Sequence, residues 1–569
     1  MNSEKNSIEA LKDSLKAGFK GDVDDSAAAL ATYSHDASLL EVRPRIVLFP
    51  KDADDIKTVV RFVHENKAKY PDLSITVRAA GSDMSGGPLN DSIILDVTKY
   101  MRGIKSITKH PTQTEMDSGE ATVLPGMFYR DFEPEAAKLG LLLPCYTASK
   151  NLNTLGGMVG NNSAGEKTLR YGKTEDFIKQ LRVVFADGNE YVVKPLSKAE
   201  LDRKIAQNDF EASVYREIWD IVSKNSAALA KAKPRVSKNS AGYYLWNVWD
   251  GRTFDLTKLI VGSQGTLGIA TEVTFRLVPI KPLSKLFVVF MPSLDHLGEI
   301  VRDIAAFRPE SFESYDDSTM ALAVKFMPDM LRTMHLHNFA RLLWSFRPEA
   351  WMALSGGFPK LVLLVEFCGS DATAIDAEID ALEAKIRHYG FKMRRAKNEF
   401  DSEKYWTIRR ESFNLLRKHV KGRRTAPFVD DIIVPPETMP EFLPKMRKIL
   451  DEYKLLYTIA GHAGNGNFHI IPLMDMRDPA NARAIDEVSD KVYDLVLSYG
   501  GSITAEHNDG IIRTPYLAKQ FGSEIVALFK RAKDAFDPED IFNPGKKVPG
   551  LGPDAPGTKA YMMEHLARS

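Results

Sequence analysis

The sequence contains very little cysteine and no surplus of charge. Only two of its 569 residues are cysteines, Cys145 and Cys368, so neither a disulfide framework nor a cysteine-rich zinc module is available. The four thiolates that an iron–sulfur cluster needs are missing as well. Lys and Arg together number 76, as do Asp and Glu, so no overall charge steers the chain toward nucleic acid or an anionic membrane. We expect no nucleic-acid partner.

Long apolar runs are missing too. No stretch approaches the 18 or more uncharged apolar residues of a membrane span, and the first residues lack the apolar run of a signal peptide. We therefore expect a cytoplasmic protein without a transmembrane segment, and peripheral attachment to the inner face of the membrane stays open. None of the glycine-rich loops matches a Walker loop or a Rossmann G-x-G-x-x-G unit, which disfavours ATP and a tightly bound nicotinamide dinucleotide.

The composition that remains, 44% hydrophobic and 27% charged, is typical of a globular protein, and the length predicts at least two domains. Near the start, residues 45–50 predict a strand, 52–67 a helix and 73–81 a strand that ends in a glycine loop. From about residue 281 a second strand–helix–strand–helix series begins, with strands near 285–291 and 360–369 and helices near 293–308 and 371–390. This series predicts a second α+β domain.

Three loops are dense in Gly, Ser, Thr and Asn, at residues 78–87, 144–172 and 259–279. Such loops can bring several backbone N–H groups onto a phosphate, because no large side chain blocks the approach. The alternative is that each is a plain tight turn. A large cofactor that contains a pyrophosphate fits all three.

The stretch GHAGNGNFHI at 461–470 places His462 and His469 seven residues apart in a chain with only 12 histidines. One interpretation is a glycine-rich turn with solvated imidazoles. The other is a pair of metal ligands whose third ligand comes from elsewhere in the chain. SITAEHNDG at 502–510 supplies Glu506, followed directly by His507. Two imidazoles and one carboxylate suit Zn²⁺, Fe²⁺ or Mn²⁺.

The order of seven motifs resembles one known family. RAAGSDMSGG, NLNTLGGMVGNNSAG, RYG, VGSQGTLGI, GHAGNGNFH, TAEHNDG and FDPEDIFNPGKK follow one another between residues 33 and 547, as in the FAD-linked D-2-hydroxyacid dehydrogenases of the D-lactate and D-2-hydroxyglutarate type. These belong to the vanillyl-alcohol-oxidase-type flavoprotein superfamily. The resemblance implies an α+β fold, with an FAD-binding domain of two subdomains and an α+β cap domain that has an antiparallel sheet. The limits expected are 1–34 for a helical extension, 35–280 for the FAD domain, 281–535 for the cap with an insertion at 318–358, and 536–569 for a segment that returns to the FAD domain.

The resemblance also implies which residues contact FAD, bound non-covalently: Arg78, Ala80, Gly81, Ser82, Asp83, Gly86, Asn153, Thr154, Gly156, Gly157, Asn161, Ser163, Gly165, Gly262, Gly265, Thr266, Gly268, Ile269 and Asn543. The sequence departs from the family pattern at four positions. Ala79 and Asn508 stand where relatives have Gly, Gln264 where they commonly have Glu, and Asn465 where they have Asp. We expect these changes to alter local contacts and to leave the fold intact.

By the same resemblance, His462, His469 and Glu506 hold a divalent metal, and His507 is the base. Arg409, in the segment EKYWTIRRESFN, is expected to bind the substrate carboxylate, with Arg513 as a second candidate. Two such anchors would suit a dicarboxylate such as 2-hydroxyglutarate, and one would suit lactate. A surface helix with both Arg409 and Arg410 in solvent is the alternative for the first segment.

The function expected from the resemblance is oxidation of a D-2-hydroxy acid by FAD with metal assistance. Electrons would pass to a separate acceptor, which is an iron–sulfur protein, an electron-transfer flavoprotein or a quinone. The Met- and aromatic-rich segment 318–358 is either helical core packing or the docking surface for that acceptor. The alternative function is a metal-independent flavin oxidase, or an enzyme like alkyl-glycerone-phosphate synthase, of the same superfamily.

Overall fold

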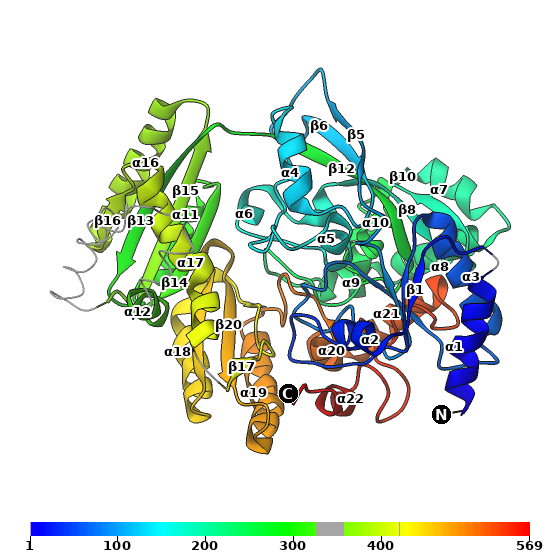
Figure 1. The fold of residues 1–569 in the computed structure, drawn as a ribbon. Helices are drawn as coiled ribbons and strands as arrows, with labels where there is room; N and C mark the ends of the chain where they lie inside the picture. The colour runs from blue at the N-terminus through cyan, green and yellow to red at the C-terminus, as the bar shows by residue number, and fades with distance from the viewer. Residues whose placement is uncertain (1, 17, 326–357, 420–421, 569) are drawn as a thin grey trace.

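A computed structural model describes the chain except for residues 1, 17, 326–357, 420–421 and 569. The expected insertion at 318–358 therefore lies mostly outside the described residues. The described strands form three main sheets and one two-stranded ribbon. Near residue 280 the chain passes from the first two main sheets to the third. Figure 1 shows the third sheet with its helices on one side and the first two sheets on the other.

The first sheet has four strands in the order β1-β2-β4-β3, and three of them are parallel. Its parallel strands are almost entirely apolar because helices and loops cover both faces. α3 packs beside them, capped by Asp52, whose carboxylate accepts the N–H groups of Asp54 and Asp55. The strands are β1 (Asp22–Asp24), β2 (Ile46–Phe49), β3 (Ile75–Arg78) and β4 (Ile93–Asp96).

The second sheet is antiparallel, in the order β5-β6-β12-β8-β9, with β7 paired to the end of β12. β12 is the long central strand, and its buried and partly exposed residues alternate, as expected for a strand with one face on the core. The strands are β5 (Ile104–Lys109), β6 (Gly119–Val123), β7 (Leu141–Leu142), β8 (Ile178–Val184), β9 (Glu190–Val193) and β12 (Ile269–Pro279); the separate ribbon pairs β10 (Leu196–Ser197) with β11 (Thr253–Phe254).

The third sheet has eight strands, all paired antiparallel, in the order β16-β13-β15-β14-β19-β20-β17 with β18 on β20. The antiparallel sheet predicted for this half is thus present. Alternate residues of β13 point into two different cores: Phe287 and Val289 into one, Leu286 and Val288 into the other. The strands are β13 (Leu283–Met291), β14 (Ser311–Asp316), β15 (Leu361–Gly369), β16 (Lys392–Arg395), β17 (Arg424–Thr425), β18 (Ile432–Ile433), β19 (Leu456–His462) and β20 (Asn467–Met474).

Helices cover these sheets, and the sequence predictions for 52–67, 293–308 and 371–390 correspond to α3, α11 and α16. Within the described part of the chain, no helix combines the length and the apolar character needed to cross a membrane. The α-helices are α1 (Asn2–Leu15), α2 (Ala27–Tyr33), α3 (Ala53–Asn66), α4 (Tyr129–Ala137), α5 (Leu155–Asn161), α6 (Thr168–Tyr171), α7 (Lys198–Ile205), α8 (Phe210–Lys224), α9 (Ser226–Ala232), α10 (Thr257–Ile260), α11 (Leu297–Ala305), α12 (Asp317–Lys325), α16 (Ala372–Ile386), α17 (Glu399–His419), α18 (Met439–Glu452), α19 (Pro479–Ser498), α20 (Gly510–Arg513), α21 (Leu517–Phe536) and α22 (Lys559–Glu564).

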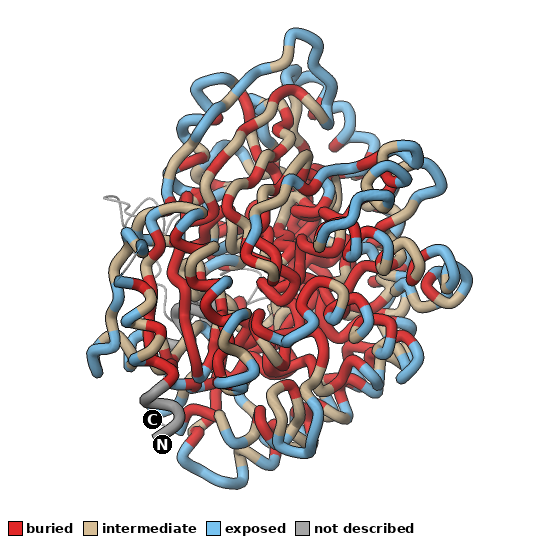
Figure 2. Tube along the Cα trace, turned by 90° about the vertical axis from the view of Figure 1, so that its right-hand side faces the viewer, coloured by how far each residue is buried: buried red, intermediate tan, exposed pale blue. Residues whose placement is uncertain are grey.

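The N-terminal extension and the segment after α21 both pair with the first sheet. The N-terminal extension, expected to be helical, also contains β1, which pairs with β2. After α21 the chain returns to β3, where the N–H of Ile75 donates to Ile541 O at 2.7 Å and the N–H of Asn543 donates to Ile75 O at 2.9 Å. Figure 1 shows α21 beside α8, and Figure 2 shows buried residues concentrated in the middle of the molecule.

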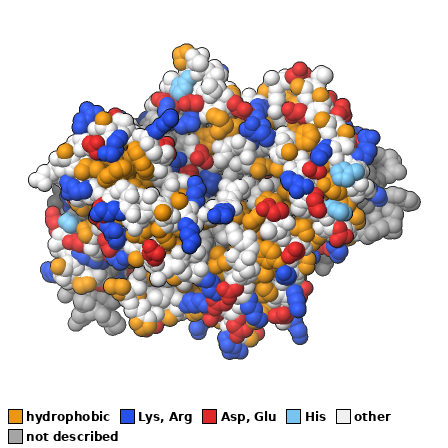
Figure 3. Space-filling model, turned by 180° about the vertical axis from the view of Figure 1, so that it is seen from behind, with side chains coloured by type: hydrophobic (Ala, Val, Ile, Leu, Met, Phe, Trp, Pro, Cys, Tyr) orange, Lys and Arg blue, Asp and Glu red, His pale blue; other side chains and the backbone are white. Residues whose placement is uncertain are grey.

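Charged side chains are spread over the surface. In the view of Figure 3, Lys and Arg alternate with Asp and Glu across the face, with small apolar patches between them. This distribution agrees with the balanced count of 76 basic and 76 acidic residues. Any strongly charged site must therefore be local.

Candidate active site

The two histidines of the GHAGNGNFHI stretch lie on one hairpin. β19 and β20 are joined by a short 3-10 turn, Ala463–Asn465, and by Gly466 at φ +73°. His469 pairs with Ala460, which is two residues before His462 on the same strand. Residues two apart share a face, and so do directly paired residues, so both imidazoles project from the same face of the hairpin. Their ring centroids are 5.4 Å apart.

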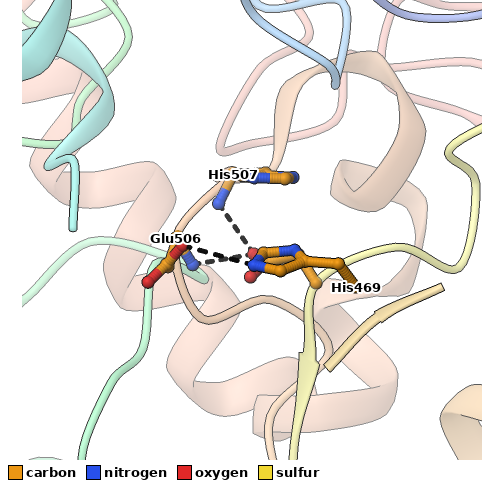
Figure 4. A group of neighbouring side chains, drawn as sticks. His469, Glu506 and His507 are labelled. Atoms are coloured by element: carbon orange, nitrogen blue, oxygen red, sulfur yellow. Dashed lines mark hydrogen bonds and ion pairs between the residues drawn. The ribbon is translucent and has the colours of Figure 1, made fainter. Parts of the chain in front are cut away.

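Glu506 lies between these two rings. It comes from the loop that follows α19, and its Oε1 is 3.3 Å from His462 Nε2 while its Oε2 is 3.7 Å from His469 Nε2. His507, the next residue, stacks on His469 with ring centroids 5.1 Å apart. Figure 4 shows His469, Glu506 and His507 directed toward one another. The structure thus brings together the four residues that the sequence singled out.

The Nδ1 atom of each imidazole faces a buried carboxylate. His462 Nδ1 is 2.5 Å from Glu313 Oε1 of β14. Asp430 serves the other two rings: its Oδ1 is 3.2 Å from His469 Nδ1 and its Oδ2 is 2.7 Å from His507 Nδ1. With a proton held on Nδ1, the Nε2 atom of each ring is left free to bind a metal or to accept a proton.

The loop that carries Glu506 and His507 is fixed by Asp431. Its Oδ2 accepts three consecutive backbone N–H groups, those of Ala505 at 2.9 Å and of Glu506 and His507 at 2.7 Å each. The hydroxyl of Thr504 donates to the same oxygen at 2.7 Å. Asp431 itself has φ +69°, in the left-handed region. A strained residue of this kind persists where several bonds hold it.

Charges in the site shift the pKa values of its members. Burial alone would raise the pKa of Glu506, but His462 and Lys238 hold it well below the usual range. Burial would lower the pKa of His507, whereas Asp430 and Asp431 raise it to about 9. A divalent cation beside Glu506 would oppose that second shift, because positive charge disfavours a protonated imidazole.

The donor set fits a divalent metal. Two Nε2 atoms and one carboxylate converge, and the opposite nitrogen of each imidazole is held by a carboxylate, which is the usual support of histidine ligands. Among the described residues, the carboxylate and imidazole atoms that all lie within 4.8 Å of one another come from Asp431, His469, Glu506 and His507, and His462 is outside this group. His469 and Glu506 are common to both groupings.

The three glycine-rich loops also converge. The N–H groups of Gly262 and Gln264 donate to Val159 O and Gly160 O at 2.8 Å each. The side chain of Asn543, fully buried, donates to Gly87 O at 2.9 Å and to Gln264 O at 2.6 Å, and accepts the hydroxyl of Thr76 at 2.8 Å. Asn543 thus joins two of the loops expected to bind FAD.

Several polar atoms in these loops fit a cofactor. Asn153 Oδ1, Asn161 Oδ1 and Asn162 Nδ2 are buried without a hydrogen-bond partner, which is costly unless a ligand supplies one. A methyl group at Gly160 would meet nothing within 4 Å, so this glycine borders open space. In the loop 78–87, by contrast, some N–H groups are already bound: those of Ser85 and Gly87 donate to Asp83 Oδ2, at 3.1 and 2.7 Å.

The other residues expected to bind FAD lie in the same loops or at their ends. Arg78 turns its guanidinium to the carbonyl oxygens of Tyr33 and His35. Several glycines are required by packing: an added Cβ would lie 2.6 Å from Pro125 O at Gly156 and 2.0 Å from Tyr146 O at Gly165. The remaining members, Ala80, Gly81, Ser82, Gly86, Thr154, Gly157, Ser163, Gly265, Thr266, Gly268 and Ile269, belong to the loops themselves or to the start of β12.

The four departures from the family pattern have local explanations. Asn508 keeps a left-handed conformation, φ +65°, and its amide donates to Asn161 O and Gly262 O at 3.0 and 2.9 Å. Asn is one of the few side chains that tolerate this region. Gln264, at φ +55°, accepts the N–H of Gly510 at 2.9 Å. Asn465 donates to Ser237 Oγ at 2.8 Å. Ala79 is not among the residues with positive φ, so its methyl group causes no backbone strain.

The two arginines expected to bind a carboxylate have partners within the protein. Arg409 lies on α17 with 11% of its side chain exposed, and its Nε and Nη2 each lie 3.1 Å from Glu313 Oε2. Its neighbour Arg410 contacts Glu166 instead, at 2.9 Å. Arg513 is fully buried and donates to Asn508 O and Asp430 O, at 3.1 and 2.5 Å.

Four residues of the site have no counterpart in the sequence prediction: Lys238, Glu313, Asp430 and Asp431. The consecutive aspartates in FVDDIIVPP, just before an apolar strand, were the one visible signal. Two adjacent carboxylates in the loop before a strand are common in proteins, so this pattern alone does not identify a site. Lys238 and Glu313 lie far from the motifs in sequence. Only the fold brings Lys238 to Glu506 and Glu313 to His462.

Comparison with protein families gives two matches. Residues 281–547 match a model described as "FAD linked oxidases, C-terminal domain", and residues 44–194 match one described as "FAD binding domain". The second contains the loop 78–87 and the whole 153–165 segment, and the first contains the hairpin and the Glu506 loop.

Comparison with individual proteins gives distant relatives along most of the chain. The D-2-hydroxyglutarate dehydrogenase of Pseudomonas putida is 28% identical over 554 residues, 96% of this chain and 52% of the relative. That of Escherichia coli is 27% identical over 560 residues, with the same two coverages. Glycolate oxidase subunit GlcD of Bacillus subtilis is 26% identical over 532 residues, 92% of this chain and 93% of the relative. The chain thus spans about half the length of the dehydrogenases that it matches.

Solved structures share the fold at low sequence identity. p-Cresol methylhydroxylase aligns with a TM-score of 0.68, over 96% of this chain and 97% of that one, at 16% identity. 4-Ethylphenol oxidase from Gulosibacter chungangensis aligns at 0.67, with the same coverages and identity. An alkyldihydroxyacetonephosphate synthase aligns at 0.64, over 94% and 85%, also at 16% identity. At this identity the likeness concerns the fold alone.

Proposed function

We propose that this chain, which belongs to the FAD-linked oxidases with a vanillyl-alcohol-oxidase-type fold, is a dehydrogenase that oxidises a D-2-hydroxy acid to the 2-oxo acid. One observation carries the proposal. The Nε2 atoms of His462 and His469 face the two oxygens of Glu506, with His507 stacked beside them. This arrangement supports the assignment of His462, His469 and Glu506 as metal ligands, and of His507 as the base that oxidation of an alcohol needs.

In the proposed reaction His507 takes the hydroxyl proton on its Nε2. Asp430 supports this role because its Oδ2 lies 2.7 Å from the opposite ring nitrogen, Nδ1, and its negative charge would stabilise the charged ring that forms. When bound, FAD would supply the acceptor for the hydrogen of the α-carbon and its two electrons, and a metal would supply positive charge beside the hydroxyl oxygen. His462, His469 and Glu506 would hold Zn²⁺, Fe²⁺ or Mn²⁺.

The carboxylate of the substrate is assigned to Arg409. Its Nε and Nη2 contact Glu313, and no partner of its Nη1 is found within the described ranges. The guanidinium can therefore bind Glu313 and still offer a donor. Arg513 is given a narrower role than the sequence suggested. Since both of its Nη atoms donate to backbone carbonyls, it joins the Asn508 loop to the Asp430 loop.

The relatives' names support 2-hydroxy acids as the substrate class, and among them 2-hydroxyglutarate, lactate and glycolate. Non-covalent FAD and a separate electron acceptor are parts of the same proposal. The runner-up, a metal-independent oxidase or ether-forming enzyme, rests on fold likeness at 16% identity. The convergence of two imidazoles on Glu506 favours the dehydrogenase.

The decisive experiment is anaerobic flavin bleaching with D- and L-2-hydroxy acids, before and after treatment with a chelator. We expect rapid bleaching by a D-acid, loss after chelation and recovery with Zn²⁺ or Mn²⁺. In His507→Ala the FAD should stay bound while the bleaching rate falls by about 10² to 10⁴. His388→Ala, in the exposed 3-10 turn Arg387–Tyr389 that follows α16, is the matched control and should bleach at the normal rate. Full-rate bleaching in His507→Ala would refute the assignment of the base, and chelator-resistant bleaching would favour the runner-up.

A further inference from the structure

One charged residue of the site has no role in the reaction described above. Lys238 lies in the loop between α9 and the short helix at Leu245–Asn247, and its side chain has 0% exposure. Its Nζ is 2.5 Å from Glu506 Oε1. His462 Nε2 approaches the same oxygen, at 3.3 Å. A buried ammonium group thus contacts the carboxylate that we assign to the metal.

The segment around Lys238 is fixed on the Glu506 loop. Ser240 donates from its N–H to Thr504 O at 3.0 Å and from its hydroxyl to Ala505 O at 2.8 Å. The N–H of Gly242 donates to Asp509 Oδ2 at 2.9 Å. These bonds flank Glu506 on both sides, so the ammonium is held against its carboxylate by the backbone. Lys238 also links the site to the half of the chain that precedes β13.

The charges in this pair act on metal binding in a definite direction. Glu506 is buried and its charge is compensated by Lys238, so the metal-free protein does not depend on a cation to neutralise it. A divalent cation that binds at Glu506 meets the positive charge of Lys238 next to it. The lysine therefore opposes the metal while it holds the carboxylate in one orientation.

On this basis, which rests on the metal site proposed above, we propose that Lys238 is a positioning residue that orients Glu506 and weakens the binding of the divalent metal. Without Lys238, Glu506 would be a buried carboxylate short of one counter-charge, and the metal would supply it. If Lys238 only supported the fold, its removal would change the affinity for the metal in the opposite direction. Its loss would disorder the Glu506 loop and weaken metal binding.

The test is the dissociation constant of Zn²⁺, measured on the full, FAD-loaded chain by competition with a chromophoric chelator. Three variants separate charge from hydrogen bonding. Lys238→Met removes both, Lys238→Gln keeps a donor without the charge, and Lys238→Arg keeps both. Lys173→Met is the matched control, because Lys173 is also buried beside this loop but, among the described residues, donates to carbonyl and hydroxyl oxygens alone, including Ala505 O at 3.3 Å.

We expect Lys238→Met and Lys238→Gln to bind Zn²⁺ at least tenfold more tightly than the wild type, and Lys238→Arg to stay within about threefold. Thermal unfolding should agree, since Zn²⁺ should raise the melting temperature of Lys238→Met more than that of the wild type. Lys173→Met should lose stability without tighter binding. Folded Lys238→Met or Lys238→Gln with equal or weaker binding would overturn the inference. Failure of the wild type to bind Zn²⁺ would instead remove the proposed metal site, before any variant is compared.

Discussion

At the scale of single residues, the neighbours Asp430 and Asp431 show how position decides the use of a carboxylate. Asp430 points to the imidazoles of His469 and His507, while Asp431 points to the backbone of the next segment and accepts three of its N–H groups. The difference comes from the left-handed conformation of Asp431, φ +69°, which turns its side chain away from that of Asp430. Asp430 therefore orients the imidazole rings of His469 and His507, and Asp431 fixes the loop that carries Glu506 and His507.

Lys546 gives a prediction about pH and stability. It is 3% exposed, its ammonium donates to Leu89 O at 2.7 Å, and burial lowers its pKa from 10.5 to about 8. Between pH 8 and 10.5 the unfolded chain thus binds a proton at this lysine that the folded chain has released. Folding is penalised below pH 8, and the penalty disappears as the pH rises through this window.

The free energy of unfolding of the wild type, minus that of Lys546→Met, should therefore increase by up to about 3 kcal/mol from pH 8 to pH 10.5. Urea unfolding of both proteins across this range measures the difference. Lys231→Met, at an exposed position, should give a difference that stays flat. A flat difference for Lys546→Met as well would show that the folded protein keeps this lysine charged without cost.

At the scale of elements, the β19–β20 hairpin depends on Gly466. This residue has φ +73°, and a Cβ there would lie 2.0 Å from Val434 O. Gly466→Ala must therefore shift either the turn or the strand segment before Pro436. His462 and His469 flank this turn, so their relative position should change with it.

We expect Gly466→Ala to lose the tight binding of Zn²⁺ while it keeps FAD, because the loops assigned to FAD lie elsewhere. Gly390→Ala is a sharp control. It has nearly the same torsion, φ +71°, but a Cβ there meets nothing within 4 Å. The control should cost only the strain of the left-handed conformation, about 1 kcal/mol, and should bind Zn²⁺ normally. Metal content and FAD absorbance of the two purified variants decide the matter, and equal metal content would contradict the prediction.

At the scale of the whole molecule, the vanillyl-alcohol-oxidase-type fold predicted from the order of motifs is confirmed by solved structures that cover 96% of the chain. The residues that we assign to the metal and to the base come from the half of the chain that forms the third sheet and from the loop after it. The residues expected to bind FAD come from the first two sheets and the C-terminal return. Lys238 and Asn508 connect the two groups.

The route of the electrons is the prediction that belongs to this scale. The chain has two cysteines and no Rossmann fingerprint, so it offers neither an iron–sulfur cluster nor a tightly held nicotinamide cofactor. We expect the purified, FAD-loaded protein to reduce artificial dyes readily with a D-2-hydroxy acid, and NAD and oxygen at no more than a few per cent of that rate. Stopped-flow and steady-state assays with the three acceptors measure this. Rapid reduction of NAD would contradict the prediction.

The sequence by itself determined the class of fold, through the order of seven motifs that resembles one family, and it supplied the candidate cofactor loops and the candidate residues His462, His469, Glu506 and His507. The individual elements and motifs follow from local patterns. Alternation of apolar residues indicates strands, and apolar residues at helical spacing indicate helices. A motif of neighbouring residues indicates the same chemistry wherever it lies in the chain. The departures at Asn508 and Gln264 were visible too, although the left-handed torsions that explain them were not.

Only the tertiary structure decided what surrounds those residues. Glu313 lies 149 positions before His462, and Lys238 lies 268 positions before Glu506, and both pairs touch. Arg409 and Arg513, read from the sequence as carboxylate anchors, are held by Glu313 and by backbone carbonyls. The physical reason is that a buried charge needs a partner at contact distance, and the fold, unlike a local pattern, selects that partner from anywhere along the chain.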